Sequence, residues 1–219
     1  MEDARRQLYG GFAAVARALG HVHRLALLEQ LAQGEAAVDT LASRTGLSVA
    51  NASQHLQQLR HGGLVRSQRA GKHVRYRLAD GPIVEAMTVL RAIAERNLAE
   101  VRQAATAFAR DLDELEPVTR AELLQRLESG SAILLDVRPS DEYRLGHLPG
   151  ALNATLEDLA SGTVELPKER EIIAYCRGPY CILSAEAVQL LRRQGFNVRR
   201  LKDGFPEWRA AGLAVEATG

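Results

Sequence analysis

The segment Glu171–Ser184 constrains the fold of this 219-residue chain more than any other stretch. An apolar, β-branched run, Ile172–Tyr175, leads straight into Cys176. A six-residue loop ends at Cys181 and is followed by apolar residues at helical spacing. Strand, tight loop and helix in this order are typical of parallel α/β folds that present a reactive group at a strand end. The segment therefore predicts an α/β domain built around this loop.

Cys176 and Cys181 are the only cysteines in the chain, so any thiol chemistry must take place in this loop. Backbone N–H groups of such a loop and of the following helix stabilise negative charge, and Arg177 adds a cation beside the first thiol. We expect the pKa of Cys176 to lie well below the ~8.5 of a free thiol. An inert buried thiol and a structural disulfide are the alternatives, and the neighbouring Arg177 and Gly178 favour a reactive thiol over both.

The net charge of +1 hides an asymmetry along the chain. Residues 1–80 hold 11 Lys and Arg against 6 Asp and Glu, and residues 41–79 hold seven Lys and Arg and no acid. A concentrated basic block is the electrostatic signature of a polyanion site, whereas a solvated face usually mixes both signs. The N-terminal part of the chain is therefore predicted to bind nucleic acid.

The patterns within this block predict a helix-turn-helix followed by a basic hairpin. Apolar residues recur at helical spacing over 12–31, a short helix over 38–45 ends at Gly46, and Ser48 caps a helix over 49–61. The polar face of that last helix carries hydrogen-bonding side chains without negative charge, which suit a DNA major groove. The residues predicted to contact DNA are Ser48, Asn51, Ser53, Gln54, His55 and Gln57 on the helix, and Arg69, Lys72 and Arg75 on the strand-like hairpin over residues 64–78.

Three motifs, within residues 41–48, 53–59 and 63–78, resemble the ArsR family of bacterial repressors, and the match extends over about residues 8–115. The resemblance implies an α+β winged helix-turn-helix that binds double-stranded operator DNA as a homodimer. Metal-sensing members of that family carry cysteines before the recognition helix or histidines on the C-terminal helix, and this chain has neither. His21 and His23 are predicted to lie on different faces of a helix. We therefore expect no metal site and no cofactor.

Residues 83–115 carry an apolar stripe that predicts one long helix of roughly 50 Å. A stripe of this length favours a dimer interface over packing within a small domain. Pro117 ends the helix, so the predicted domains are residues 1–116 for DNA binding and dimerisation and residues 117–219 for the α/β unit.

Four strand-like runs near residues 133–137, 148–153, 172–175 and 198–201 alternate with helical segments in this second part. They predict a parallel sheet covered on both faces. Asp136-Val-Arg138, Gly146-His-Leu-Pro-Gly-Ala151, the Cys176 loop and Asp203-Gly together resemble the rhodanese domain, over residues 118–215. The resemblance implies that Cys176 carries sulfur, that the loop cradles the anionic persulfide, and that Asp136 and Arg138 brace the sheet end. Arg177 and Cys181 complete the predicted site.

Two classes of function remain at this stage. The first is a transcriptional repressor that responds to reactive sulfur species, or to another thiol-reactive agent, through Cys176. The second is a thiosulfate or persulfide sulfurtransferase that the DNA-binding half regulates or localises. The resemblance implies a glycine at the fourth loop position in members that use thiosulfate, whereas this loop has Pro179, which has no N–H to cradle the anion. Cys181 could capture the persulfide, by a direct disulfide or through inserted sulfur. The start of the chain has no signal-peptide pattern and no run reaches ~18 apolar residues, so a cytoplasmic protein without membrane contact is expected.

Overall fold

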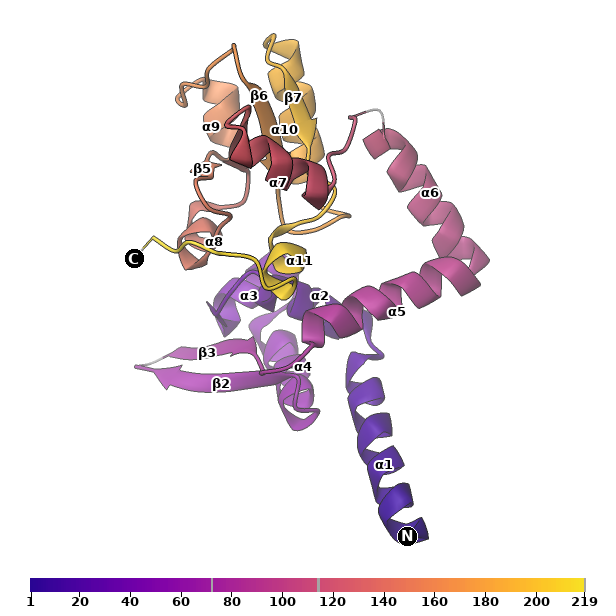
Figure 1. The fold of residues 1–219 in the computed structure, drawn as a ribbon. Helices are drawn as coiled ribbons and strands as arrows, with labels where there is room; N and C mark the ends of the chain where they lie inside the picture. Colours follow the sequence, from indigo (N-terminus) through magenta and orange to yellow (C-terminus); the bar gives the residue numbers. More distant parts are fainter. Residues whose placement is uncertain (72, 114, 219) are drawn as a thin grey trace. The chain divides into compact units, whose positions relative to one another are not determined.

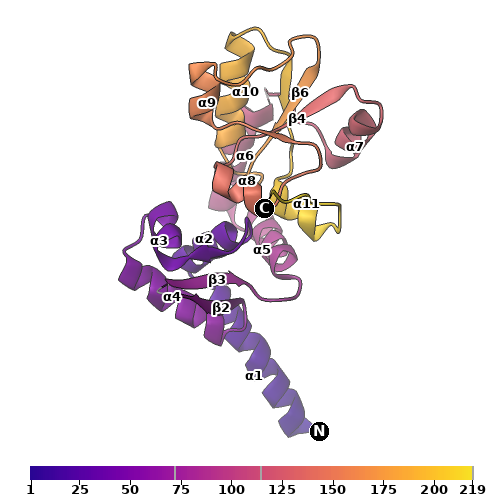
Figure 2. The same ribbon diagram turned by 90° about the vertical axis from the view of Figure 1, so that its left-hand side faces the viewer.

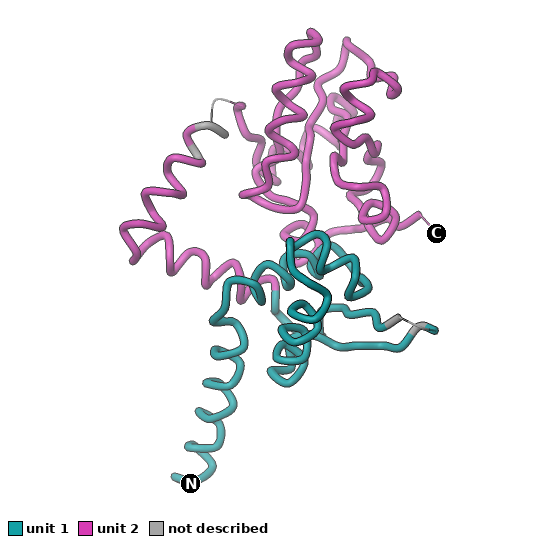
Figure 3. Tube along the Cα trace, turned by 180° about the vertical axis from the view of Figure 1, so that it is seen from behind, with its two compact units in different colours: residues 1–83 teal, residues 84–219 magenta. Residues whose placement is uncertain are grey.

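The computed structural model describes residues 1–71, 73–113 and 115–218 and divides into two compact units, residues 1–83 and residues 84–219 (Figure 3). The first unit is an α+β winged helix-turn-helix and the second contains a four-stranded parallel sheet, so the predicted fold class is confirmed. The functional boundary between residues 116 and 117 remains a prediction.

The winged helix-turn-helix of the first unit is built from four helices and a small sheet (Figure 1). Its elements are α1 (Glu2–Leu19), α2 (Val22–Leu31), β1 (Ala36–Ala37), α3 (Val38–Thr45), α4 (Val49–His61), β2 (Val65–Ala70) and β3 (His73–Leu78). The sheet is antiparallel with the order β1-β3-β2. Leu28, Leu41, Leu56 and Leu59 are fully buried and hold α2, α3 and α4 together. The predicted helix-turn-helix and hairpin are both confirmed.

The helix predicted over residues 12–31 is two helices, with a break at Gly20 and His21. The His21 side chain accepts a hydrogen bond from His23 N and so caps α2. The Arg24 guanidinium donates to the carbonyl oxygens of Arg17 and Ala18, the last acceptors of α1. These side-chain bonds satisfy the backbone groups that a helix end leaves open, which is why the chain can turn here.

The stripe over residues 83–115 also forms two helices, α5 (Ile83–Asn97) and α6 (Ala99–Asp113), instead of the predicted single helix. Figure 1 shows that the two run in different directions. The Asn97 amide donates to Ile93 O, and Arg102 Nη1 donates to Arg96 O. Side chains thus take over carbonyls next to the break, and apolar periodicity alone carries no sign of such local competition.

The sheet of the second unit has the strand order β5-β4-β6-β7, and every pairing is parallel. The strands are β4 (Ala132–Asp136), β5 (Leu152–Asn153), β6 (Glu171–Tyr175) and β7 (Val198–Arg200), close to the four predicted runs. The helices are α7 (Arg120–Glu128), α8 (Ser140–Leu145), α9 (Leu156–Ser161), α10 (Leu183–Arg193) and α11 (Phe205–Ala210). Alternation of strands and helices produces the parallel sheet.

Helices cover both faces of this sheet, as predicted, and each face has its own core (Figure 2). On the α9–α10 face, Ile172 and Ala174 pack with Val188 and Leu191. On the opposite face, the core consists of Ile173, Tyr175 and Leu201 with Leu123 of α7 and Phe205 and Trp208 of α11. Alternate residues of β6 thus serve different cores, and Cys176, which opens the cysteine loop, belongs to the core on the α9–α10 face.

Candidate functional site

The cysteine loop, residues 176–181, lies between the carboxyl end of β6 and the start of α10. Cys176 is 2% exposed and Cys181 is partly buried, and both are free thiols. The carboxyl ends of parallel strands are where α/β folds place their sites. The structure therefore brings both cysteines together at the edge of the sheet that the sequence indicated.

Two buried residues that the sequence analysis did not single out support Cys176. Its Sγ lies 3.2 Å from Ser184 Oγ in the first turn of α10, and that hydroxyl oxygen also accepts a hydrogen bond from Arg200 Nε at 3.0 Å. Arg200 Nη2 donates to Pro179 O at 2.6 Å, so the same guanidinium holds the loop. Strand alternation, which places Arg200 on the same face of β7 as the buried Val198, was the available signal for this role.

The sequence suggested that Arg177 lies free beside Cys176, but its side chain is paired with another residue. Its guanidinium makes a two-pronged ion pair with the fully buried carboxylate of Glu142, with Nη2–Oε1 at 2.7 Å and Nε–Oε2 at 3.0 Å. Glu142 lies in α8, 35 residues earlier, and local sequence carries no sign of this pairing. Arg177 therefore fixes the start of the loop while still contributing positive charge near the thiols.

Asp136 and Arg138 lie together at the end of β4, and both side chains are fully buried. Arg138 donates to both carboxylate oxygens of Asp136 and to Gly146 O, and its guanidinium lies 4.2 Å from the ring centroid of Phe205. The pair joins β4, the segment after α8 and α11 at the edge of the sheet that carries the loop. Their role as support for the cysteine loop remains a prediction.

The expected low pKa belongs to the other cysteine. Burial, followed by the neighbouring Cys181, raises the pKa of Cys176 well above its usual value. The hydrogen bond from Cys176, followed by the backbone N–H groups of Arg177 and Leu183, lowers the pKa of Cys181 to about 6. The prediction for Cys176 was wrong because full burial disfavours its charged form more than the loop favours it. Of the two neighbouring thiols, Cys181 is therefore the one that ionises more readily.

The N–H of Gly178 is directed at Cys176, whereas the N–H groups of Arg177 and Leu183 are directed at Cys181. The N–H groups that stabilise its sulfur come from both ends of the loop, while Cys181 N itself donates to Gly178 O at 3.1 Å. Pro179 has no N–H, and its carbonyl is held by Arg200. The side chain of Cys181 thus occupies the position in which a loop of this kind stabilises an anion.

Gly204, before α11, makes a contact with the loop that permits no side chain. A Cβ placed there would collide with the backbone N of Gly178 and lie 2.6 Å from the carbonyl carbon of Arg177. Phe205 N also donates to Cys176 O at 3.0 Å. The start of α11 therefore positions the first half of the cysteine loop through backbone contacts alone.

The recognition helix α4 begins as predicted. Ser48 Oγ accepts a hydrogen bond from Asn51 N at 3.3 Å, and Ala52, Leu56 and Leu59 face inward with no exposed surface. Asn51 and Gln54 are exposed, whereas Ser53 and His55 are partly buried. The polar face that the sequence predicted is therefore present on the helix.

Several predicted DNA contacts have partners within the protein. Gln57 Nε2 donates to Tyr76 Oη at 3.1 Å, and Arg75 Nε donates to Glu35 Oε1 at 2.5 Å, so both side chains hold the wing against the rest of the domain. Arg69 is exposed on β2, and Lys72 lies outside the described residues. The wing thus provides fewer free cations than the sequence count suggests.

Three histidine rings gather beside the recognition helix. The ring centroid of His55 lies 4.4 Å from that of His21 and 5.4 Å from that of His23, and the latter two are 5.2 Å apart. The expectation that His21 and His23 point apart was wrong, because His21 is the N-cap of α2 and is not within the helix. Burial, followed by these neighbours and Arg24, lowers the pKa of His55.

No group of three or more His, Cys, Asp or Glu side chains among the described residues is arranged to hold a metal ion. Within the same residues, no helix combines the length and the apolar character that a membrane crossing requires.

The two units match two families. Residues 19–68 match a helix-turn-helix domain, and residues 119–211 match the rhodanese-like domain. Fold and matches together define a protein class in which an ArsR-like winged helix-turn-helix precedes a rhodanese domain.

The chain is 42% identical over 214 residues to the HTH-type transcriptional regulator Rv0324 of Mycobacterium tuberculosis, which covers 98% of this chain and 94% of that relative. The chain therefore belongs to this family of HTH-type transcriptional regulators. It is also 33% identical over 91 residues to the thiosulfate sulfurtransferase GlpE of Shewanella oneidensis, which covers 41% of this chain and 88% of that protein.

Among solved structures, the homodimeric winged helix-turn-helix DNA-binding domain of Mb0332 from Mycobacterium bovis is similar, with 35% identity and a TM-score of 0.42. The match covers 46% of this chain and 93% of that one.

Proposed function

We propose that this transcriptional regulator is a homodimeric repressor that responds to reactive sulfur through Cys176, with Cys181 as the second thiol. The observation that carries the proposal is the pair of free thiols inside a single loop, of which Cys181 ionises more readily than Cys176. Such a pair supplies both a proton acceptor and a second nucleophile next to the first. The DNA-binding unit contains no cysteine, so thiol chemistry must reach it from this loop.

The proposed first step is a sulfur transfer to Cys176. The Cys176 S–H passes its proton to the Cys181 thiolate, and the Cys176 thiolate attacks the sulfane sulfur of a persulfide donor, R–S–SH. A new S–S bond forms at Cys176 as the donor's S–S bond breaks, and its electron pair leaves with R–S⁻. The product is Cys176–S–SH, and Arg200 and Ser184 lie close enough to stabilise charge on Cys176 Sγ.

The second step closes a bridge. Cys181 loses its proton to R–S⁻ or solvent, and its thiolate attacks Cys176 Sγ. This forms the disulfide and expels HS⁻, so the two thiols are oxidised and the sulfane sulfur is reduced to sulfide. If both cysteines already carry a persulfide, the terminal sulfur of Cys176–S–S⁻ attacks Cys181 Sγ and expels HS⁻ instead. The bridge is then a trisulfide, which suits cysteines held too far apart for a direct bond.

Tyr180, the neighbour of Cys181, connects the cysteine loop to helices α5 and α6 and would transmit a change in the loop to them. Its hydroxyl donates a hydrogen bond to Glu95 of α5, the Arg91 guanidinium lies 5.6 Å from its ring centroid, and the Phe108 ring of α6 packs edge-on at 5.5 Å. A bridge at Cys181 would displace Tyr180 and so alter its contacts with both helices. Allosteric coupling requires such a difference between two states.

The homodimer is proposed to use residues 83–115. Leu90 and Leu98 of the predicted stripe are 39% and 55% exposed in the single chain, and Val89 and Ile93 beside the stripe are 57% and 54% exposed. Exposed apolar residues in a row typically mark an interaction surface. A two-fold dimer through these helices would match the symmetry of a palindromic operator.

The DNA contacts are proposed for the polar face of α4, with Asn51, Ser53, Gln54 and His55 near base edges. Arg69 and Lys72 of the wing are proposed to contact phosphate. Gln57 and Arg75 would contact DNA only by giving up Tyr76 and Glu35, so their main role is to position the wing.

A sulfurtransferase is the second candidate function, because the sequence of the rhodanese domain is similar to that of a thiosulfate sulfurtransferase. The two candidates differ in what happens to Cys176. A sensor keeps a stoichiometric modification, whereas an enzyme passes the sulfur on in many turnovers. Incubation with thiosulfate and cyanide, followed by measurement of thiocyanate per mole of protein, separates them.

The direct test compares wild-type protein with Cys176→Ser and Cys181→Ser before and after treatment with inorganic polysulfide. Mass spectrometry reads the added sulfur, and a binding titration reads affinity for a DNA site selected from a random library. We expect wild-type protein to change affinity, Cys176→Ser to bind DNA and ignore polysulfide, and Cys181→Ser to gain a persulfide with a weak response. A Cys176→Ser protein that still responds would place the sensor elsewhere and overturn the proposal.

A further inference from the structure

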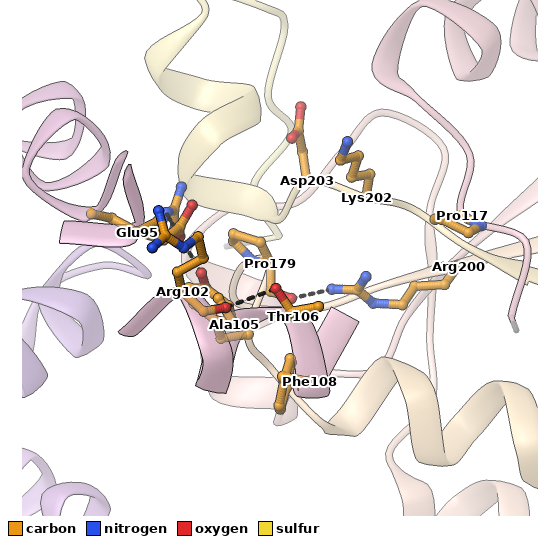
Figure 4. Close-up of a pocket in the computed structure, with 12 residues that line it drawn as sticks. Glu95, Arg102, Ala105, Thr106, Phe108, Pro117, Pro179, Arg200, Lys202 and Asp203 are labelled. Atoms are coloured by element: carbon orange, nitrogen blue, oxygen red, sulfur yellow. Dashed lines mark hydrogen bonds and ion pairs between the residues drawn. The ribbon is translucent and has the colours of Figure 1, made fainter. Parts of the chain in front are cut away.

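The second unit contains a cavity of about 450 Å³ next to the cysteine loop (Figure 4). Its walls come from α5, α6, the loop residues Pro179 and Tyr180, and the segment that begins at Arg200. Neither cysteine sulfur lines it. The volume lies within the range of sites that bind small organic molecules, about 300–1,000 Å³.

The cavity lining carries more cations than acids. Arg102, Arg200 and Lys202 all line it, and the described side chains place no carboxylate within ion-pair distance of any of the three. The two acidic residues in the lining are already engaged. Glu95 accepts from Tyr180 and pairs with Arg91 at 3.9 Å, and Asp203 pairs with Arg120 at 3.4 Å.

One wall of the cavity is aromatic. The rings of Phe108 and Tyr180 meet edge-on with centroids 5.5 Å apart, and both line the cavity. Ring faces and edges of this kind bind apolar or aromatic parts of a ligand, whereas the cations across the cavity bind its charged groups. Figure 4 shows Arg102, Lys202 and Arg200 around the same space as Phe108.

We propose that this cavity is a binding site for a small organic anion that carries an apolar or aromatic group, and that it is distinct from the sulfur-binding position at Cys176. The charged end of the ligand would lie between Arg102, Lys202 and Arg200. Its apolar part would lie against Phe108 and Tyr180. The regulator would then receive a second chemical signal beside the thiol one.

The cavity is connected to the two thiols of the cysteine loop through Arg200. That guanidinium lines the cavity and donates to Ser184 Oγ, which is hydrogen-bonded to Cys176. Its charge also acts on both cysteines. An anion bound against Arg200 offsets this positive charge, so the thiolate forms less readily and the loop reacts more slowly. Ligand and reactive sulfur would therefore oppose each other in the same loop.

The experiment uses the full chain and two matched probes. Isothermal titration compares isophthalate, an aromatic dianion, with isophthalamide, its neutral counterpart of similar shape. We expect measurable binding of isophthalate only, weakened about 3- to 10-fold by Arg102→Gln and by Lys202→Gln. Arg193→Gln is the control, because Arg193 is an exposed arginine at the end of α10, outside the cavity lining. This control should bind isophthalate like wild type.

Equal binding of both probes, unchanged binding by the two cavity variants, or equal weakening by Arg193→Gln would each overturn the proposal. Cys176→Ser should retain isophthalate binding, so this result does not depend on the sulfur response. The alkylation rate of the loop thiols by iodoacetamide should fall as the cavity fills, and its pH profile should shift to higher pH. A rate that is unchanged at saturating isophthalate would disprove the connection through Arg200.

Discussion

The two cysteines differ in environment more than in sequence context, and that difference decides their chemistry. Cys176 is buried and holds its proton, whereas Cys181 receives hydrogen bonds from Cys176 and from two backbone amides. The thiolate fraction of Cys181 rises as pH passes its pKa of about 6, so alkylation at Cys181 should rise through the same range. Peptide mass spectrometry after short iodoacetamide pulses between pH 5 and 9 measures this directly.

The matched variants assign the titration to one sulfur. Cys181→Ser should remove the fast reaction between pH 6 and 8, because burial keeps Cys176 protonated. Cys176→Ala removes the largest stabiliser of the Cys181 thiolate, so the midpoint should move to higher pH. A midpoint near 6 at Cys176 in the Cys181→Ser protein would reverse the assignment.

Arg138 provides a second prediction at this scale. Arg138→Met leaves the fully buried Asp136 carboxylate without its cation, and breaking a buried pair in this way typically costs about 3–5 kcal/mol. Urea unfolding of the full chain measures the loss of stability. Arg193→Met, on the exposed end of α10, should stay within about 0.5 kcal/mol of wild type. A small effect of Arg138→Met would mean that water or another group replaces the guanidinium.

The sequence predicted the loop and its two cysteines but not the residues that tune them. Ser184 contacts Cys176 from 8 positions away, Arg200 contacts Ser184 from 16 positions away, and Glu142 pairs with Arg177 across 35 positions. Contacts of this range depend on how strands order within the sheet, which local patterns do not specify. Burial of Cys176 likewise follows from packing on both faces of the sheet and reverses the expected pKa shift.

At the scale of elements, the contact between the start of α11 and the cysteine loop leaves no space for a side chain at Gly204. Gly204→Ala would place a methyl group against the backbone of Arg177 and Gly178, and overpacking of this kind typically costs about 1–3 kcal/mol. The loop should shift, so thermal stability and the alkylation midpoint of Cys181 should both change.

The control is a substitution at Gly178, the loop residue on the other side of this contact. A Cβ at Gly178 would meet only the Glu207 carboxylate, at 3.7 Å, so Gly178→Ala should fold with little loss. If both substitutions are equally harmless, the contact at Gly204 relaxes easily and does not position the loop.

Elements whose ends carry strong local signals were predicted well. Ser48 was predicted to cap α4, and its hydrogen bond to Asn51 N is present. Thr119 and Glu122 form a capping box at the start of α7. The two long apolar stripes were predicted less well, because each contains a break made by side chains that bind carbonyls. Arg24 at the first break and Asn97 at the second are ordinary helix residues until their partners are known.

At the scale of the whole molecule, the exposed apolar residues of α5 and of its junction with α6 predict an assembly. Leu98→Arg changes a residue that is 55% exposed in the single chain, so each monomer should fold normally. In a dimer through this surface the arginine would be buried without a partner, at a cost of several kcal/mol. Sedimentation velocity should show a dimer for wild type and a monomer for Leu98→Arg.

The control is Gln103→Arg, an exposed polar position on α6. It should leave the dimer intact. A wild-type monomer that binds DNA, or a Leu98→Arg dimer of unchanged affinity, would place the interface elsewhere.

The last prediction concerns the connection between sulfur chemistry and DNA binding. Tyr180→Phe removes only the hydroxyl that donates to Glu95 and retains the ring that contacts Phe108 and Arg91. The variant should react with polysulfide and bind DNA like wild type before treatment. Its change in DNA affinity after treatment should be smaller than the roughly 5- to 150-fold expected of a coupled regulator.

Glu95→Gln tests the same bond from the other side, and it should reduce the response in parallel with Tyr180→Phe. Mass spectrometry of the treated samples confirms that each variant carries the same sulfur modification, so a lost response cannot be ascribed to lost reactivity. Because the two residues share one hydrogen bond, the double variant should lose no more than either single one. Additive losses would show that the signal leaves the cysteine loop by separate routes, and a full response in all three would exclude this contact as the link.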